Sequence, residues 1–142
     1  MKITKSISLP KYSEIGHFEE VFCLELPKDF KKFLRAFNAI YLEESIYTTK
    51  EEKYYIDRFY PFGENIELSI QNVYDNLNGY FQNQYIAFAN DPGDWQYVIS
   101  LLVDTYGQIY LCRMDDILPY SLTYMANSFG EFINGLKRED EI

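Results

Sequence analysis

The residues behind Leu26-Pro27 repeat apolar positions at the spacing of an amphipathic helix. Proline is tolerated at the first helical position, where its missing N–H would have no partner within the helix anyway. The apolar stripe, at i, i+3, i+4 and i+7, consists of Phe30, Phe33, Leu34 and Phe37. The opposite face is basic and carries Lys28, Lys31, Lys32 and Arg35. The pattern predicts a helix that packs its phenylalanines against a core and leaves its cations in solvent.

The same periodicity predicts three more helices. One covers residues 66–78 and stops at an Asn-Gly pair. Another covers residues 128–137, where Ser128 and Glu131 have the spacing of a capping box, so that each side chain can satisfy a free backbone donor of the first turn. A weaker helix covers residues 11–20.

The middle of the chain has the alternation and the composition of β-strands. Residues 53–60 alternate between two faces and predict one half-covered strand, and residues 85–89 predict another. Residues 95–103 and 108–114 are rich in aromatic and β-branched side chains. The turn at 104–107 between them ends in a glycine, which can adopt positive φ, so these two strands are expected to form a hairpin.

Helices near the ends and strands in the middle predict an α+β fold with a mainly antiparallel central sheet flanked by three to four helices. The chain has 142 residues, of which 47 % are apolar, so it can bury a core as one domain over residues 1–142. No repeat or linker divides it. Only residues 139–142 are expected to form a flexible tail.

Apolar runs are too short for a membrane span, which needs roughly 20 residues; residues 98–103, for example, are interrupted by Ser100. The basic N-terminal residues are not followed by an apolar signal region, so we expect a cytoplasmic protein with no membrane partner. Cys23 and Cys112 lack a CxxC pattern and are flanked by apolar residues, which predicts two reduced, buried thiols.

Charge is distributed unevenly along the chain. Residues 1–60 carry ten acids and ten bases, whereas residues 61–142 carry twelve acids and three bases, so the whole net charge of −9 lies in the second part. Nucleic-acid binding requires cations that displace phosphate counterions, and this balance argues against it. A basic protein partner fits the charge better.

Side chains with catalytic or metal-binding chemistry are few. The single histidine, His17, has no nucleophile in a recognisable motif, and Cys112 lies within an apolar strand, where a thiol is normally inert. The carboxylates with the best chance of surrounding a divalent cation are Asp91, Asp94, Asp115 and Asp116, but they lack EF-hand spacing. We therefore expect no catalytic residue, no cofactor and no metal site, and solvated carboxylates at turns.

Five segments, in order, resemble a known family. They are LPKDFKKFLRAFNA, FYPFGE, YIAFANDPGDWQYVISL, YGQIYLCRMDD and SFGEFINGL. Together they cover most of residues 26–136 and resemble the SUKH superfamily, in particular its Smi/Knr-type branch. The positions that match the motifs of the family are Leu26 and Pro27 at the helix start, Asn38 at its end, Pro61 and Gly63 after a strand, and Gly93 before the long hairpin.

The resemblance implies a single α+β domain that binds proteins and has no known catalytic role. Bacterial members act as immunity proteins that neutralise a polymorphic toxin domain, often a nuclease, by direct contact. A related fungal domain regulates cell-wall glucan synthesis, so an adaptor role is the alternative. This chain departs from the family pattern at Ala39 and Ile40, where two glycines are usual, and at Asp94-Trp95, where a small residue is usual. The turns at these two places are therefore expected to differ in shape from those of the family.

The aromatic content, 14 Tyr and 11 Phe, is high; core packing is expected to take most of the Phe, whereas the Tyr-rich acidic region can be core, plain surface or an interface. Tyrosine is enriched at interfaces because it offers a large contact area at little entropic cost. The predicted protein-binding residues lie in the acidic part of the chain and comprise Asp91, Asp94, Trp95, Tyr97, Asp115 and Asp116. They are expected to meet a basic toxin domain by mimicking phosphates, and the chain is expected to be a monomer or a weak homodimer.

Overall fold

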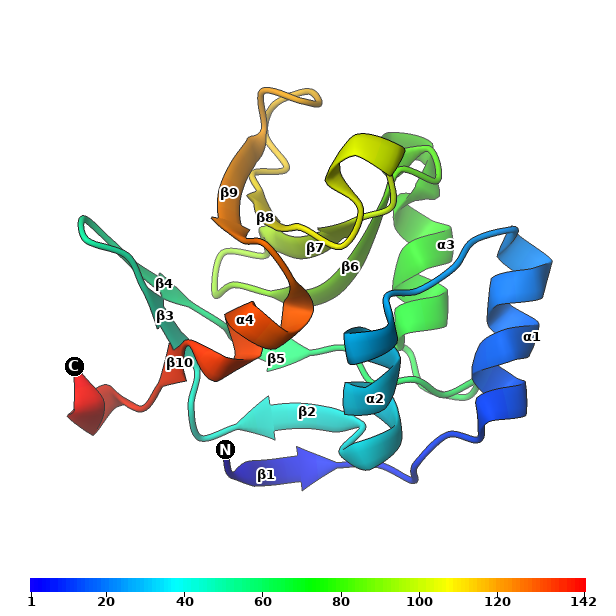
Figure 1. Ribbon diagram of the computed structural model, residues 1–142, viewed down its shortest axis with the longest axis horizontal. Helices are drawn as coiled ribbons and strands as arrows, with labels where there is room; N and C mark the ends of the chain where they lie inside the picture. The colour runs from blue at the N-terminus through cyan, green and yellow to red at the C-terminus, as the bar shows by residue number, and fades with distance from the viewer.

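The computed structural model describes residues 1–142 and centres on a five-stranded antiparallel sheet (Figure 1). Its strands lie in the order β5 (Arg58–Phe59), β6 (Tyr85–Asn90), β7 (Gln96–Ser100), β8 (Ile109–Cys112) and β9 (Leu122–Ala126). Every residue of β6 and β7 is buried. These two strands are covered on both faces, so their sequence is a nearly continuous apolar run instead of an alternating one.

Two small antiparallel sheets lie beside the central one. The first pairs β1 (Ile3–Ser6) with β2 (Ala39–Leu42), and the second has the order β10 (Leu136–Lys137), β3 (Ile46–Thr48) and β4 (Lys53–Tyr55). Figure 1 shows the β3–β4 hairpin projecting from the body at the side opposite α1. The predicted α+β class with mainly antiparallel strands is confirmed.

Four helices and two 3₁₀ turns complete the fold. They are α1 (Tyr12–Phe22), α2 (Lys28–Ala36), α3 (Ile70–Phe81), α4 (Phe129–Asn134), η1 (Val103–Thr105) and η2 (Glu139–Glu141). Consecutive strand residues point to opposite faces of a sheet. Tyr97 contacts Phe132 of α4 on one face, and Tyr85, which lies on the other face, contacts Phe81 of α3. The sheet therefore lies between α2 and α4 on one side and α3 on the other.

Phenylalanines form the centre of the core between the sheet and the α2–α4 pair. The Phe88 ring of β6 lies 6.2 Å from Phe30 of α2, 5.2 Å from Phe129 and 5.7 Å from Phe132 of α4, measured between ring centres. Nine of the 11 phenylalanines are buried. Edge-to-face contacts of this kind add to the free energy gained by burying aromatic area. Most of the phenylalanines of the chain therefore serve to pack the core.

The predicted single strand over residues 53–60 is wrong. The chain instead forms β4 in one sheet and β5 in another, and it crosses between them at Ile56 and Asp57. The Ile56 N–H donates to the Ser45 carbonyl at 2.8 Å, and the Asp57 N–H donates to the Asn90 carbonyl at 2.8 Å. The buried side of the chain changes where it passes from one sheet to the other. The alternation in the sequence therefore indicated extended backbone correctly, but it did not indicate that the strand is interrupted.

Several predicted helix boundaries move. Helix α3 starts at Ile70, capped by Ser69, and continues past Gly79 to Phe81, ending where Gln82 adopts φ of 52°. Helix α4 ends at Asn134, because the next residues pair with β3 as strand β10. One half of the capping box predicted at its start is present, because the Ser128 hydroxyl accepts the Glu131 N–H at 3.1 Å. The weaker helix, predicted over residues 11–20, is the longer α1.

Helix α2 forms behind Pro27 as predicted, with Phe30, Phe33 and Leu34 buried, while Phe37 lies beyond its end and is partly exposed. Its basic face is less solvated than predicted. Lys31 forms an ion pair with Glu19 of α1 at 3.2 Å, and the Arg35 guanidinium lies over the Tyr12 ring at 3.6 Å. Two of the four cations therefore hold α1 against α2.

Asn38 carries the turn between α2 and β2. Its φ is 41°, whereas Ala39 and Ile40 are already extended in β2, so the two positions that lack the glycines of the family need no positive φ. The Asn38 amide donates to the carbonyls of Ser8 at 2.7 Å and Phe62 at 2.9 Å, and its oxygen accepts the Phe62 N–H at 2.7 Å. This one buried side chain ties three segments together.

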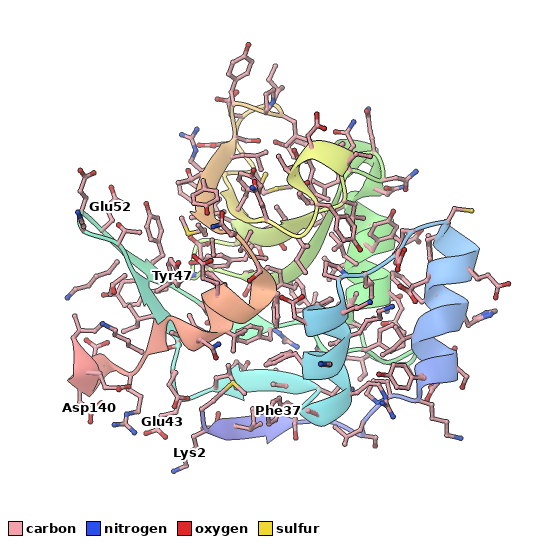
Figure 2. The ribbon with its side chains drawn as sticks, in the orientation of Figure 1. Lys2, Phe37, Glu43, Tyr47, Glu52 and Asp140 are labelled. Carbon is pink, nitrogen blue, oxygen red and sulfur yellow. The ribbon has the colours of Figure 1, made fainter.

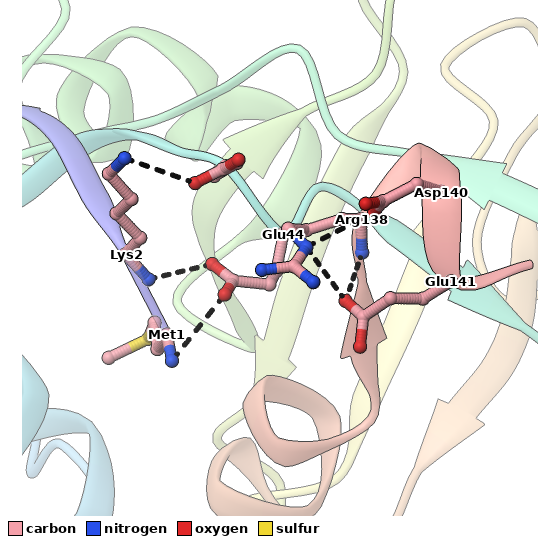
Figure 3. A network of polar contacts seen from close by, with 7 residues as sticks. Met1, Lys2, Glu44, Arg138, Asp140 and Glu141 are labelled. Atoms are coloured by element: carbon pink, nitrogen blue, oxygen red, sulfur yellow. Dashed lines mark hydrogen bonds and ion pairs between the residues drawn. The ribbon is translucent and has the colours of Figure 1, made fainter.

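Glu43 and Glu44 hold the N-terminal strand in place (Figure 3). The Glu44 carboxylate accepts the Lys2 N–H at 2.7 Å and lies 3.4 Å from the Met1 ammonium, while Lys2 Nζ lies 3.7 Å from Glu43. The hydrogen bond from the Lys2 backbone is the main reason that the pKa of Glu44 is lowered. A second group in the same view joins Arg138 to Asp140 at 3.1 Å and to Glu141 at 3.4 Å, which orders η2.

Because two tyrosines are buried, we expect the protein to lose stability at alkaline pH. The Tyr60 hydroxyl donates to Gln96 at 2.6 Å, the Tyr97 hydroxyl donates to the Tyr55 carbonyl at 2.8 Å, and burial raises the pKa of both phenols. The unfolded chain therefore releases these protons first, at its ordinary pKa of about 10, and the free energy of unfolding falls as pH rises above that value.

We expect each buried phenol to lower the free energy of unfolding by about 1.4 kcal/mol for every pH unit above about 10. Urea unfolding at pH 8, 10 and 11 measures this dependence. In Tyr97→Phe the fall between pH 10 and 11 should be visibly shallower than in the unchanged protein. Identical pH dependence in both proteins would contradict the assignment.

The two cysteines differ, which corrects the prediction that both are buried. Cys112 is buried in β8, but Cys23 caps the C-terminus of α1 with φ of 53° and is exposed, although its neighbours Phe22 and Leu24 pack against the core. Burial also raises the pKa of Cys112. A thiol reagent should therefore modify one thiol rapidly in the native protein and two after unfolding. Cys23→Ser should remove the rapid reaction, and a rapid reaction that persists would contradict the structure.

Candidate protein-binding surface

The β6–β7 turn contains the first predicted site residues. One Asp91 oxygen accepts the N–H groups of Gly93 at 2.9 Å and Trp95 at 2.8 Å. Asp94 is exposed, has φ of 66°, and accepts the side-chain amides of Asn90 at 3.2 Å and Gln96 at 3.3 Å. Each aspartate thus uses one oxygen to hold the turn, while its other oxygen accepts no hydrogen bond within the chain. In this turn Asp94, not Gly93, adopts the positive φ.

The two aromatic residues of the predicted site have different surroundings. Trp95 is half-buried and packs against the edge of the core. Tyr97 is fully buried, with its ring against Phe88 and Phe132. The expectation that Tyr97 contacts a partner directly is therefore wrong, because its side chain points into the α4 face of the sheet as part of the core.

Asp115 and Asp116 lie in the loop between β8 and β9 and are both exposed. Strand pairing places Gln96 opposite Cys112, so this loop and the β6–β7 turn leave the sheet at the same end. The loop then continues toward α3, where the Tyr80 hydroxyl donates to the Asp116 carbonyl at 2.5 Å. No hydrogen bond or ion pair joins the two acidic turns, and no three His, Cys, Asp or Glu side chains gather as metal ligands.

The structure adds two residues that the sequence interpretation missed. Beside the two aspartates, Ile117 is 67 % exposed and Tyr120 is 71 % exposed. They lie in the β8–β9 loop (residues 113–121), which projects beyond the sheet in Figure 1. Two exposed side chains of this size within one loop, next to two carboxylates, make the loop a candidate contact surface. The sequence contains a signal for these two residues, because an apolar run directly follows the two aspartates. It was missed because β9 was not predicted, so this segment was not recognised as a loop between two strands.

Internal hydrogen bonds fix the shape of the β8–β9 loop. The Arg113 guanidinium donates to the Tyr120 carbonyl at 2.6 Å, and the Ser121 N–H donates to the Ile117 carbonyl at 3.0 Å. The Tyr80 hydroxyl also bonds the Ser121 hydroxyl at 2.7 Å. The loop is thereby preorganised, so little conformational entropy is lost when a partner contacts its tip.

The charge around the β8–β9 loop is negative. Of the three bases in residues 61–142, Lys137 and Arg138 lie near the C-terminus, whereas Arg113 lies in the loop itself, which leaves the loop with a net charge of −1. The loop itself contributes two carboxylates, and Ile117 N–H uses one oxygen of Asp116 at 2.7 Å. The tip is therefore an apolar and acidic surface, which complements a basic partner.

The two residues considered for catalysis have ordinary surroundings. His17 is exposed on α1. The Cys112 thiol contacts the Ser121 hydroxyl at 3.5 Å and the Tyr80 hydroxyl at 3.8 Å, and its raised pKa keeps it protonated. A protonated, buried thiol is a poor nucleophile.

The family-motif positions are structural. Leu26 is buried, and its N–H donates to Glu19 at 2.7 Å, which positions Pro27 at the start of α2. The Pro61 carbonyl accepts the Ile70 N–H at 2.9 Å, and the Gly63 N–H donates to Gln71 at 3.1 Å. These bonds join the end of β5 to the start of α3 across a connection with no regular structure.

Residues 10–135 match the model of the SMI1 / KNR4 family (SUKH-1). The chain belongs to this SUKH-1 family. The match covers α1 to α4 and every motif position named above, and it confirms the resemblance noted in the sequence. No curated protein matches the chain. None of the helices of this SUKH-1 domain is long and apolar enough to cross a membrane. Family membership supports a role of the SUKH kind and leaves immunity and glucan-synthesis regulation as its two forms.

Proposed function

We propose that this SUKH-1 domain is an immunity protein that neutralises a basic toxin domain by direct, stoichiometric binding. The observation that carries the proposal is the tip of the β8–β9 loop, where Ile117 and Tyr120 are held exposed beside Asp115 and Asp116. A preorganised apolar anchor with an acidic border suits a tight contact with a cationic surface. The complex is expected to form in the cytoplasm.

We expect the chain to neutralise the toxin domain by occlusion, that is, by covering its surface. The acidic border steers the basic domain toward the loop, and the apolar tip then excludes water from the contact. The free oxygens of Asp91 and Asp94, at the same end of the sheet, extend the acidic border. Carboxylates arranged in this way occupy the positions that the phosphates of a nucleic acid would take on a nuclease.

Affinity capture with the tagged chain from its native cells tests the proposal. The captured partner, identified by mass spectrometry and then prepared in pure form, is titrated with the chain at about 50 mM and about 500 mM salt. Immunity predicts a single basic domain, bound near one to one, whose association slows roughly tenfold or more at the higher salt. Several cell-wall or signalling proteins, held weakly and without salt dependence, would instead support the adaptor role.

A further inference from the structure

A groove of 430 Å³ lies between α1 and the start of α3. Its lining comes from one face of α1, from the connection between β5 and α3, and from the first turn of α3. Figure 1 shows α1 standing beside α3 at the edge of the molecule, away from the β3–β4 hairpin. The groove has no part in the binding surface described above.

The floor of the groove is aromatic. The Phe18 ring lies 5.0 Å from Phe22 and 5.8 Å from Phe62, and Phe22 packs edge-on against Tyr74 at 5.1 Å. Phe18 and Phe62 are almost fully buried beneath the groove, whereas Val21 on its wall is 58 % exposed. Val21 and the half-buried Phe22 therefore carry the apolar surface of the groove that no element of the chain covers, and this surface suits apolar side chains of another molecule.

The rim of the groove is acidic. Glu14 of α1 and Glu64 of the β5–α3 connection line it, and no lysine or arginine does. One Glu14 oxygen accepts the Lys11 N–H at 2.9 Å, and neither glutamate takes part in a salt bridge. Two carboxylates without counter-charges beside exposed apolar surface complement a ligand that is both apolar and cationic.

We propose that this groove binds an amphipathic segment of a partner protein, with apolar side chains against Val21 and Phe22 and Lys or Arg side chains at Glu14 and Glu64. Helices recognised in grooves use this combination of an apolar face and flanking charges. The site is separate from the β8–β9 loop: Asn72 lines the groove, whereas Tyr80 holds the loop eight residues later, about 12 Å along α3. The inference therefore goes beyond the proposed function and does not rest on it.

A synthetic amphipathic helix of Lys and Leu, titrated into the ¹⁵N-labelled full chain, tests the groove, and the same peptide with Glu in place of Lys serves as its control. We expect amide shift changes at the lining residues of α1 and of the start of α3 with the basic peptide only. Shift changes centred on residues 113–121, or none with either peptide, would overturn the proposal.

The variant Glu14→Gln/Glu64→Gln separates the groove from the general negative charge of the chain. Glutamine can still accept the Lys11 N–H, so the start of α1 is kept. The matched control, Glu51→Gln/Glu52→Gln, removes the same charge from the β3–β4 hairpin, at whose tip Figure 2 labels Glu52, on the side of the molecule opposite α1. We expect the groove variant to weaken peptide binding roughly fivefold and the control less than about twofold. Equal weakening by both would overturn the proposal.

The apolar part has its own pair of variants. Val21→Ser removes exposed apolar surface from the groove wall, and Val103→Ser removes it from η1, where the side chain is 94 % exposed and lies outside the groove. Val21→Ser should weaken binding of the basic peptide about threefold, whereas Val103→Ser should not change it. An effect of Val103→Ser as large as that of Val21→Ser would show that the peptide does not use the groove.

Discussion

Replacing Ile117 and Tyr120 together by serine is expected to weaken binding of the captured partner at least about 100-fold. Truncating a central anchor residue of an interface commonly costs about 2 kcal/mol or more, and the β8–β9 loop exposes two candidate anchors. The bonds that shape the loop use the carbonyls of Ile117 and Tyr120 and survive the change. Isothermal titration of the purified pair measures the affinity.

The matched control removes exposed apolar side chains elsewhere. Val103→Ser/Tyr55→Ser changes one residue of η1 and one of β4, both exposed. It should leave the affinity within about twofold, and both double variants should melt within a few degrees of the unchanged protein. A loop variant that binds as tightly as the control would show that the anchor lies elsewhere.

Asn38→Ala is expected to lower the free energy of unfolding by roughly 3–5 kcal/mol, the largest stability effect of any single change considered. The alanine leaves the N–H and the carbonyl of Phe62 without their partner in a buried place, and it removes the part-buried bond to the Ser8 carbonyl. It also places a Cβ-bearing residue that lacks the local hydrogen bonds of asparagine at φ of 41°. Urea unfolding measures the loss, which is a large part of the stability of an ordinary domain.

Asn38→Gly separates the two causes. Glycine adopts positive φ freely, so it should recover about 1 kcal/mol relative to alanine while still losing the three hydrogen bonds. Asn65→Ala, at an exposed position where the side chain forms no hydrogen bond within the chain, is the control and should change stability by less than about 0.5 kcal/mol. A loss below about 1 kcal/mol for Asn38→Ala would contradict the role given to this side chain.

Sequence periodicity predicted the elements whose pattern is local. The stripe of Phe30, Phe33 and Leu34 marked α2 correctly, and Gly107 marked the turn of the β7–β8 hairpin with φ of 84°. These features depend on neighbouring residues in the chain, so the sequence contains all the information that specifies them.

Elements that depend on distant partners were missed. Strand β10 has only two residues, and Leu136 continues the helical apolar stripe, so its pairing with Tyr47 of β3 was not visible in the sequence. Strands β1, β2 and β9 are short and lie at sheet edges or in a two-stranded sheet, where alternation is weak. Tertiary pairing overrides local preference in such segments.

In the candidate site, too, local features were predicted from the sequence and features that depend on tertiary structure were not. Composition located the acidic part of the chain, and the structure places Asp91, Asp94, Asp115 and Asp116 in turns at one end of the sheet. Burial is not local: Tyr97 is inside because β7 is covered on both faces, whereas Tyr120 is exposed because the β8–β9 loop leaves the sheet. The anchor residues became visible only once β9 had defined the loop that presents them.

Titrating the activity of the captured partner domain with this chain tests whether binding neutralises it. Immunity by occlusion predicts that activity falls in proportion to the chain added and reaches zero near one equivalent, since the complex is tight. The Ile117→Ser/Tyr120→Ser variant should require a large excess. Activity that persists at several equivalents of the unchanged chain, with the complex demonstrably formed, would contradict the account and favour an adaptor that binds without inhibiting.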